Sequence, residues 1–333
     1  MTSGGDVLAG QRGPHPSTIL PHSLGSAYAE CEVRVASLRS KVVLAVLPLT
    51  GRKARMADGA AMRQRLERGK AEPFTPPARM GLGCAITRRD VGGWPVFEVR
   101  PKGRAVGPRH VLYLHGGAYV SEIVSQHWDF VGRLARRLGA TVVVPIYPLA
   151  PRSTHRAVLP ALLELYRGLA QRVPASELTV MGDSAGAGLT LALAQLARDA
   201  GLPRPKELVL LSPWVDLATD HPDVLALEPR DPMLGVPGLQ EAGRLWADGE
   251  DLRHPLLSPL YADLRGLGRL SVFTGTRDLL NPDARRLRER AAEQGVALEF
   301  FEFPEMVHDW MVIPWLPEAR QALDHIVRLV ESA

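Results

Sequence analysis

The 333-residue sequence predicts an α/β fold: a mostly parallel, eight-stranded sheet flanked by helices, with a helical cap. Short apolar runs rich in β-branched residues alternate with helical stretches, which is typical of a parallel sheet covered on both faces. One segment, Asp220–Tyr261, is rich in Pro, Asp and Leu and interrupts this alternation. An insertion of that size in a sheet protein is usually a lid or cap over a site.

The strands and helices can be placed from these patterns. The first two strands, Ala85–Arg89 and Val96–Arg100, are expected to be antiparallel. The remaining strands are expected at Val111–Leu114, Thr141–Val144, Leu178–Met181, Leu208–Leu211, Leu270–Phe273 and Leu298–Phe303. The helices between them are expected at Ser125–Leu138, Pro160–Arg172, Ala185–Ala200, Ala284–Gln294 and Pro317–Val330.

The segment before the sheet has a helical pattern. Between Ala27 and Lys70 apolar residues recur at spacings of three and four, Pro48 interrupts them, and a second helix is expected over Ala60–Gly69. The Pro-rich stretch Glu72–Pro77 marks a boundary. We therefore expect residues 1–78 to contribute helices to the cap, and residues 79–333 to form a catalytic domain with the cap insertion at about 218–262.

Charge is distributed unevenly along the chain. Residues 1–110 contain 18 Lys and Arg against 8 Asp and Glu, a net charge of +10, whereas residues 111–333 contain 22 against 28, a net charge of −6. A basic segment favours anionic surfaces or substrates, and the alternative is a solvated helical face decorated with arginine. No nucleic-acid-binding module is recognisable, so no nucleic-acid partner is expected.

The sequence predicts a cytoplasmic protein without stable membrane insertion. Residues 1–30 lack the basic start and apolar run of a secretory signal, and the apolar run Val42–Leu49 is too short to span a bilayer. Cys31 and Cys84 give no disulfide framework and are expected to be buried free thiols. The last strand, Leu298–Phe303, is expected at a sheet edge, which is one route to a homodimer.

A candidate nucleophile lies in Gly182-Asp183-Ser184-Ala185-Gly186, which fits the pattern G-x-S-x-G. It follows a predicted strand and leads directly into a predicted helix, as a nucleophile elbow requires. The flanking glycines are needed because larger side chains would crowd the tight turn. The helix N-terminus places the N–H of Ala185 where an oxyanion would develop.

The oxyanion hole is predicted in His115-Gly116-Gly117-Ala118, just after the strand Val111–Leu114. Consecutive glycines leave backbone N–H groups unobstructed, so Gly116, Gly117 and Ala185 are the expected donors. His115 precedes the nucleophile and is interpreted as a structural residue that fixes the glycine loop.

A serine nucleophile needs a histidine base and an orienting carboxylate, which follow it in the order Ser, acid, His. His308 comes five residues after the strand Leu298–Phe303, at the edge of a parallel sheet where catalytic groups gather. Asp278 directly follows the strand Leu270–Phe273 and is the predicted acid. Asp283 is interpreted as a helix N-cap, and Asp309 is expected to point away from its neighbour His308.

These motifs resemble those of the hormone-sensitive-lipase-like branch, the bacterial family IV esterases, of the α/β-hydrolase fold. The resemblance spans about residues 80–332 and includes Tyr147-Pro148-Leu149-Ala150-Pro151 and Ser212-Pro213-Trp214-Val215-Asp216-Leu217. It implies a triad of Ser184, Asp278 and His308 and hydrolysis of short- to medium-chain acyl esters. Pro148 and Arg152 depart from the residues usual in that family.

The resulting hypothesis is a serine carboxylesterase that acts through an acyl-enzyme on a small-molecule ester, without a cofactor or metal. An unperturbed histidine pKa of about 6.5 predicts that activity rises through mildly acidic pH. Trp214 and Trp310 are candidates for the wall of the acyl pocket, and ordinary core aromatics are the alternative. A lactone hydrolase or amidase would use the same triad, and a non-catalytic small-molecule receptor is a more distant alternative.

Overall fold

The computed structural model describes residue 1 and residues 36–68, 74–103 and 105–332. The predicted irregular segment 1–30, the first part of the helix predicted from Ala27, and Cys31 lie outside the described residues, as does the beginning of the boundary Glu72–Pro77. Cys84 is a buried free thiol, as the sequence predicts.

An eight-stranded sheet forms the centre of the protein, in the order β1-β2-β4-β3-β5-β6-β7-β8. The strands are β1 Cys84–Val91, β2 Trp94–Pro101, β3 His110–Leu114, β4 Thr141–Pro145, β5 Leu178–Asp183, β6 Glu207–Leu211, β7 Arg269–Gly275 and β8 Leu298–Phe303. β1 and β2 pair antiparallel, β2 runs antiparallel to β4, and the remaining pairs are parallel. The predicted mostly parallel sheet is confirmed, and β8 lies at its edge.

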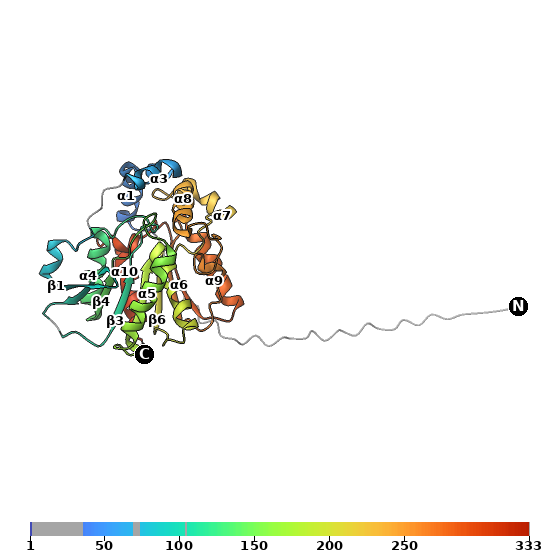
Figure 1. Ribbon diagram of the computed structural model, residues 1–333. Helices are drawn as coiled ribbons and strands as arrows, with labels where there is room; N and C mark the ends of the chain where they lie inside the picture. The colour runs from blue at the N-terminus through green and yellow to red at the C-terminus, as the bar shows by residue number, and fades with distance from the viewer. Residues whose placement is uncertain (2–35, 69–73, 104, 333) are drawn as a thin grey trace.

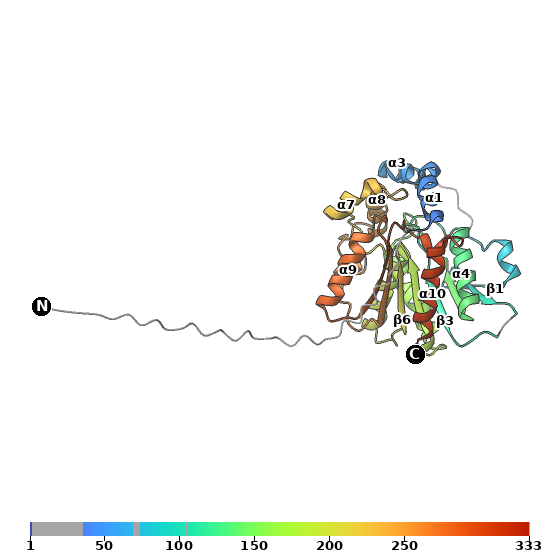
Figure 2. The same ribbon diagram turned by 180° about the vertical axis from the view of Figure 1, so that it is seen from behind.

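Helices cover both faces of this sheet. The helices that follow the strands are α4 Ser125–Leu138, α5 His155–Ala170, α6 Ala185–Asp199, α9 Asn281–Glu293 and α10 Pro317–Glu331. α5 and α6 pack against each other on the face turned to the viewer in Figure 1, and α4 and α10 lie together on the opposite face in Figure 2. The central strands are buried between these layers, and every residue of β4, β5 and β6 is buried.

Two helix starts differ from the sequence-based expectation. α5 begins at His155 and carries Pro160 inside it, whereas proline was expected to mark its start. α9 begins at Asn281, so Asp283 lies in the first turn and Leu280 occupies the N-cap. The N-cap interpretation of Asp283 is therefore wrong: its buried carboxylate pairs with Arg286 one turn later, at 2.7 Å from Nη1.

A layer of helices lies over the carboxyl ends of the strands (Figure 1). It consists of α1 Leu38–Val46, α2 Arg52–Met56 and α3 Gly59–Glu67 from the N-terminal region, with α7 Pro222–Leu227 and α8 Val236–Ala247 from the insertion between β6 and β7. α2 and α3 both contact α8. Lys53 on α2 donates to the carbonyl oxygens of Glu228 and Asp231 in the insertion, so the two segments are bonded directly.

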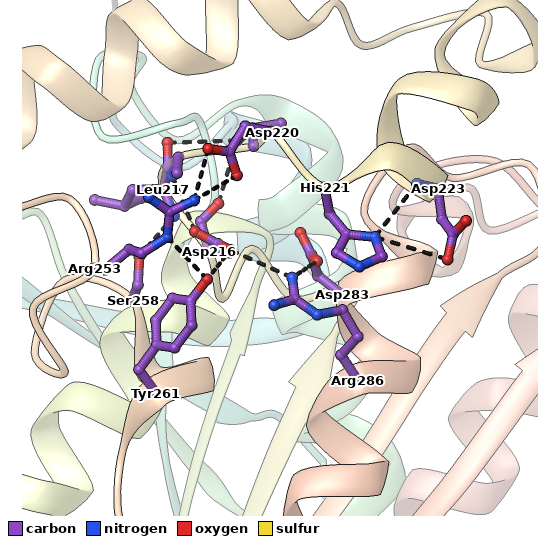
Figure 3. A network of polar contacts seen from close by, with 12 residues as sticks. Asp216, Leu217, Asp220, His221, Asp223, Arg253, Ser258, Tyr261, Asp283 and Arg286 are labelled. Carbon is purple, nitrogen blue, oxygen red and sulfur yellow. Dashed lines mark hydrogen bonds and ion pairs between the residues drawn. The ribbon is translucent and has the colours of Figure 1, made fainter.

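A network of charged groups joins the two ends of this insertion to α9 (Figure 3). Asp216 accepts a hydrogen bond from the Tyr261 hydroxyl at 2.7 Å, and Arg286 contacts both Asp216 and Asp283. Arg253 donates to both carboxylate oxygens of Asp220, at the start of the insertion, at 2.8 and 2.6 Å. Because the buried carboxylates of Asp216 and Asp283 share Arg286, the start of the insertion is fixed to α9.

Among the residues described, no helix is both long and apolar enough to cross a lipid bilayer.

Candidate active site

Ser184 lies in the sharp turn between β5 and α6. Its backbone has φ 50° and ψ −118°, a conformation that costs free energy for any residue with a side chain. A Cβ on Gly182 would lie 2.2 Å from the carbonyl oxygen of Gly186, and a Cβ on Gly186 would lie 2.0 Å from that of Leu114. Only glycine therefore fits on either side of this serine, which is the geometry expected of a nucleophile elbow.

His308 and Asp278 meet at the carboxyl edge of the sheet, as their positions after β8 and β7 predict. Nδ1 of His308 lies 3.1 and 3.0 Å from the two carboxylate oxygens of Asp278. Both side chains are buried, and Asp278 also accepts a hydrogen bond from the backbone N–H of Leu280 at 2.9 Å. An imidazole held in this way has one defined orientation, with Nε2 free to face another group.

Asp309 occupies that other side of the imidazole. Its carboxylate lies 3.1 Å from Nε2 of His308, so the expectation that Asp309 points away is wrong. The physical reason is the backbone of Asp309, whose φ of 52° is left-handed and turns the side chain back toward the preceding residue. His308 is therefore placed between two carboxylates.

The position of His308 between two carboxylates determines the pKa values of His308 and Asp309. Burial lowers the pKa of His308, but the charges of Asp278 and Asp309 outweigh burial and raise it well above its ordinary value. Burial raises the pKa of Asp309 to about 6, against the attraction of His308. The sequence-based expectation of an unperturbed histidine is therefore wrong, because it took no account of a second carboxylate.

Asp183, the variable residue of the elbow motif, is fully buried beneath the glycine loop. It accepts hydrogen bonds from the Tyr113 hydroxyl and from the backbone N–H of Gly116, the latter at 2.9 Å, and lies 3.1 Å from Nε2 of His127. Burial alone would raise the pKa of Asp183, but the charge of His127 and the two side-chain hydrogen bonds hold it below its usual value. The carboxylate is thus a fixed negative charge under the loop.

This contact corrects one predicted oxyanion donor. The N–H of Gly116 already donates to Asp183, so it is not available to a substrate oxygen. Between residues 105 and 332, all of which the structure describes, no acceptor takes the N–H of Gly117 or Ala118. Gly117 has φ 121° and Ala118 has φ 52°, so the loop turns sharply and presents successive amides.

His115 is buried and has a local structural contact. Its Nδ1 lies 2.7 Å from the carbonyl oxygen of Gly116, and its ring stacks on that of Tyr147 with a centroid separation of 4.4 Å. Burial lowers the pKa of His115 to about 4, so the ring is neutral at ordinary pH. These contacts agree with its interpretation as a residue that fixes the glycine loop.

The two candidate pocket tryptophans are completely buried. Trp214 donates from Nε1 to the Thr219 hydroxyl at 3.1 Å and lies beside Tyr119, whose ring also stacks on Trp246 at 4.4 Å. Trp310 packs on Phe303 with a centroid separation of 5.0 Å. The structure gives both the surroundings of core aromatics, and their contact with an acyl group stays a prediction.

Two buried residues of the site were missed from sequence. Asp231, in the insertion, accepts hydrogen bonds from three backbone N–H groups, one of which belongs to Leu279 next to Asp278, at 2.7 Å. His127, at the start of α4, faces the carboxylate of Asp183 with its Nε2 at 3.1 Å. Neither residue belongs to a local motif that would single it out, and the partner that brings each one to the site, Leu279 or Asp183, is distant in sequence.

In the described part of the chain, one group of three or more His, Cys, Asp or Glu residues has potential metal-ligand atoms all within 4.8 Å of one another: His127, Asp183 and Asp309. Asp183 already accepts from Tyr113, Gly116 and His127, so most of the lone pairs of its carboxylate are engaged in contacts within the protein. The geometry is that of a closed ion-pair network beneath the site.

Comparison with known proteins agrees with this arrangement. Residues 111–312 match a protein family whose description is "alpha/beta hydrolase fold". The chain is 38% identical over 218 residues to an acetyl-hydrolase of Streptomyces hygroscopicus, covering 65% of this chain and 73% of that protein. It is 34% identical over 254 residues to a putative acetyl-hydrolase, LipR, of Mycobacterium tuberculosis, covering 75% of this chain and 81% of the relative.

Solved structures give the same result. The hormone-sensitive-lipase homologue EstE7, from a metagenome library, superposes with a TM-score of 0.75 at 33% identity, covering 87% of this chain and 97% of that one. The chain therefore belongs to the α/β-hydrolase family, in the branch of hormone-sensitive-lipase-like esterases, and it is a carboxylic ester hydrolase.

Proposed function

We propose that this protein is a serine carboxylesterase that hydrolyses short-chain acyl esters, acetyl esters among them, with Ser184, His308 and Asp278 as its triad. The observation that carries the proposal is the pairing of His308 with Asp278 at the sheet edge to which the strained turn of Ser184 also belongs. The preference for acetyl esters is supported by the names of two relatives, which are acetyl-hydrolases.

The proposed reaction has two acyl-transfer steps. Neutral His308 accepts the proton of the Ser184 hydroxyl as the serine oxygen attacks the ester carbonyl, and the resulting imidazolium then protonates the departing alcohol. Water attacks the acyl-enzyme with His308 again acting as base. Asp278 holds the imidazole by its Nδ1 and stabilises the cation that forms in each step.

The oxyanion that develops in both steps needs two or three N–H donors. We assign these to Gly117, Ala118 and Ala185, replacing Gly116 because Asp183 occupies its N–H. The N-terminus of α6, where Ala185 is the first helical residue, adds its positive dipole end. Removing one donor from such a hole typically costs about 2.7–4 kcal/mol of transition-state stabilisation.

The helical layer over the carboxyl ends of the strands is proposed to be the cap of this site. It combines helices from residues 1–78 with the insertion at about 218–262, and the bond from Lys53 to that insertion supports their acting as one unit. A cap of this kind would decide which acyl and alcohol groups reach Ser184. Lactone and amide hydrolysis by the same triad, a cytoplasmic location and a homodimer stay predictions.

The first test is the Ser184→Ala variant assayed with p-nitrophenyl acetate and p-nitrophenyl butyrate. Loss of a catalytic serine lowers turnover by about 10⁶-fold in comparable enzymes, while folding is expected to be retained. Circular dichroism and thermal unfolding of the variant are the control for structure. Turnover equal to that of the wild type would refute Ser184 as the nucleophile, and a panel of acyl lengths, lactones and amides on the wild type would define the substrate class.

A further inference from the structure

Helix α1 exposes an unusual stripe of apolar side chains. Leu38, Val42 and Val46 recur every fourth residue and lie on one face of the helix, with 78%, 52% and 51% of their surface exposed. Leu49, in the short helical turn that follows, is 84% exposed. An exposed single leucine needs no explanation, but a continuous row of such residues does.

The opposite side of α1 is firmly attached to the protein. Val43 is buried, and Glu318 at the start of α10 accepts hydrogen bonds from the backbone N–H of Ser37 at 2.6 Å and from the Ser40 hydroxyl at 3.2 Å. The helix is therefore held in place with its apolar stripe turned outward.

A tryptophan extends the stripe. The carbonyl oxygen of Trp315 accepts a hydrogen bond from Arg39 on α1 at 2.9 Å, so the two segments are neighbours. Trp315 is 44% exposed, whereas Trp128, Trp214 and Trp246 are each at most 1% exposed. Five of the ten exposed large hydrophobic side chains of the described residues thus lie on α1, the turn that follows it and the segment bonded to α1; they define the α1 patch: Leu38, Val42, Val46, Leu49 and Trp315.

The segment that carries this patch is basic. Residues 36–68 contain eight Lys and Arg against two Asp and Glu, a net charge of +6, although residues 111–333 carry −6. Arg39, Lys41 and Arg52 are exposed within or directly after α1 and its following turn. The sequence allowed either an anion-seeking segment or a merely solvated basic face, and the exposed apolar row beside these charges favours the first.

We propose that the α1 patch binds a lipid surface that carries anionic headgroups. An apolar row enters the boundary between headgroups and acyl chains, basic neighbours contact the phosphates, and tryptophan favours that depth. Because α1 belongs to the layer over the carboxyl ends of the strands (Figure 1), docking there would hold the proposed cap against the surface that supplies a water-insoluble ester. Only this last consequence rests on the proposed function.

The binding itself is tested without any substrate. The full-length protein is sedimented with vesicles of phosphatidylcholine alone and of phosphatidylcholine with about a third phosphatidylglycerol, at low salt and at 1 M salt. Surface charge is screened within roughly 3 Å at about 1 M salt, compared with roughly 10 Å at about 0.1 M, so binding to the anionic vesicles should fall with salt. The double variant Leu38→Asp/Val42→Asp should lose at least about tenfold in affinity, since it removes apolar burial and adds negative charge.

Two matched controls isolate the patch. Leu82→Asp makes the same change at an apolar side chain that is 87% exposed outside the patch, and it should leave binding unchanged. Brominated lipids should quench the fluorescence of the wild type but not that of Trp315→Phe, because Trp315 is the exposed tryptophan of the patch.

The outcomes are distinct from those of the esterase test. Equal sedimentation of the wild type with both vesicle types, or equal binding by the double variant and Leu82→Asp, would overturn the proposal. A wild type that is dimeric in solution and becomes monomeric in the double variant would also overturn it, because a second copy would then cover the patch. Ser184→Ala protein should bind vesicles normally, so failure of one proposal leaves the other intact.

Discussion

Replacing Asp309 by Asn changes one charge at the candidate base and little else. Asn has the size of Asp and tolerates the left-handed backbone that Asp309 adopts, with φ 52°. The substitution removes the carboxylate that lies 3.1 Å from Nε2 of His308 and leaves Asp278 on the opposite nitrogen at 3.0 Å. It therefore isolates the effect of the second carboxylate on the protonation of the base.

The expected effect follows from the sign of the pKa shift. An opposite charge at this range raises a histidine pKa by about 1–3 units, so Asp309→Asn should lower the apparent pKa of the base by about 1–2 units. Each unit corresponds to about 1.36 kcal/mol. The proposed mechanism needs neutral His308, so a lower pKa of His308 should move the rise of activity to lower pH. Because the pKa of Asp309 is itself raised to about 6, the two proteins should differ mainly above about pH 6.

The assay is kcat/KM for p-nitrophenyl acetate as a function of pH. Between about pH 6 and the lowered pKa, Asp309→Asn should be faster than the wild type by about 10- to 100-fold, with a similar plateau at high pH. Asp324→Asn, which removes an exposed carboxylate paired with Arg137, is the control and should follow the wild type. If kcat/KM rises over the same pH range in Asp309→Asn and in the wild type, Asp309 does not control the protonation of His308. Because His308 and Asp309 exchange protons together, the pH dependence of kcat/KM is compared between the two proteins as a whole.

Two further predictions concern stability. Arg286→Ala should lower the free energy of unfolding by about 3–5 kcal/mol, because Asp216 and Asp283, each only 1% exposed, would lose their shared cation. Urea denaturation measures this, and Arg290→Ala, at a surface ion pair, should change stability by at most about 1 kcal/mol. Asp231→Ala should destabilise the protein and lower kcat, since each buried N–H left without an acceptor costs about 1–3 kcal/mol and one of them adjoins the candidate acid. Unchanged kcat in that variant would show that the acid loop does not depend on this carboxylate.

Most of the fold could be predicted because its signals are local. The bounds expected for Ser125–Leu138 and Leu298–Phe303 coincide with α4 and β8, since helical and strand periodicity is written in consecutive residues. The turn at Ser184 was also predictable, because strand, motif and helix follow one another without interruption. The parallel sheet then brings the ends of β7 and β8 together, which is why Asp278 and His308 meet as expected.

The errors arose where a torsion angle or a distant partner decides the geometry. Nothing in the sequence shows that Asp309 adopts a positive φ, and adjacency to His308 suggests that the two side chains diverge. The N–H of Gly116 is taken by a carboxylate 67 residues later in the chain, a contact that requires the whole sheet to be formed. In both cases the local pattern was correctly recognised, and a side chain brought in by the fold changed what it does.

Asp183 shows why the correction at Gly116 has a functional meaning. Its carboxylate holds the loop through Gly116 and pairs with His127 on α4, and Asp183 itself is the last residue of β5, directly before Ser184. Because a negative charge in that position cannot itself stabilise an oxyanion, the proposed donors are the amides beyond it, and Gly116 carries the loop across the carboxylate. A Cβ on Gly116 would lie 2.2 Å from that carboxylate, and this close approach explains the glycine. Asp183 also helps to raise the pKa of Asp309, so one buried charge acts on the turn at Ser184, on the glycine loop and on the carboxylate beside His308.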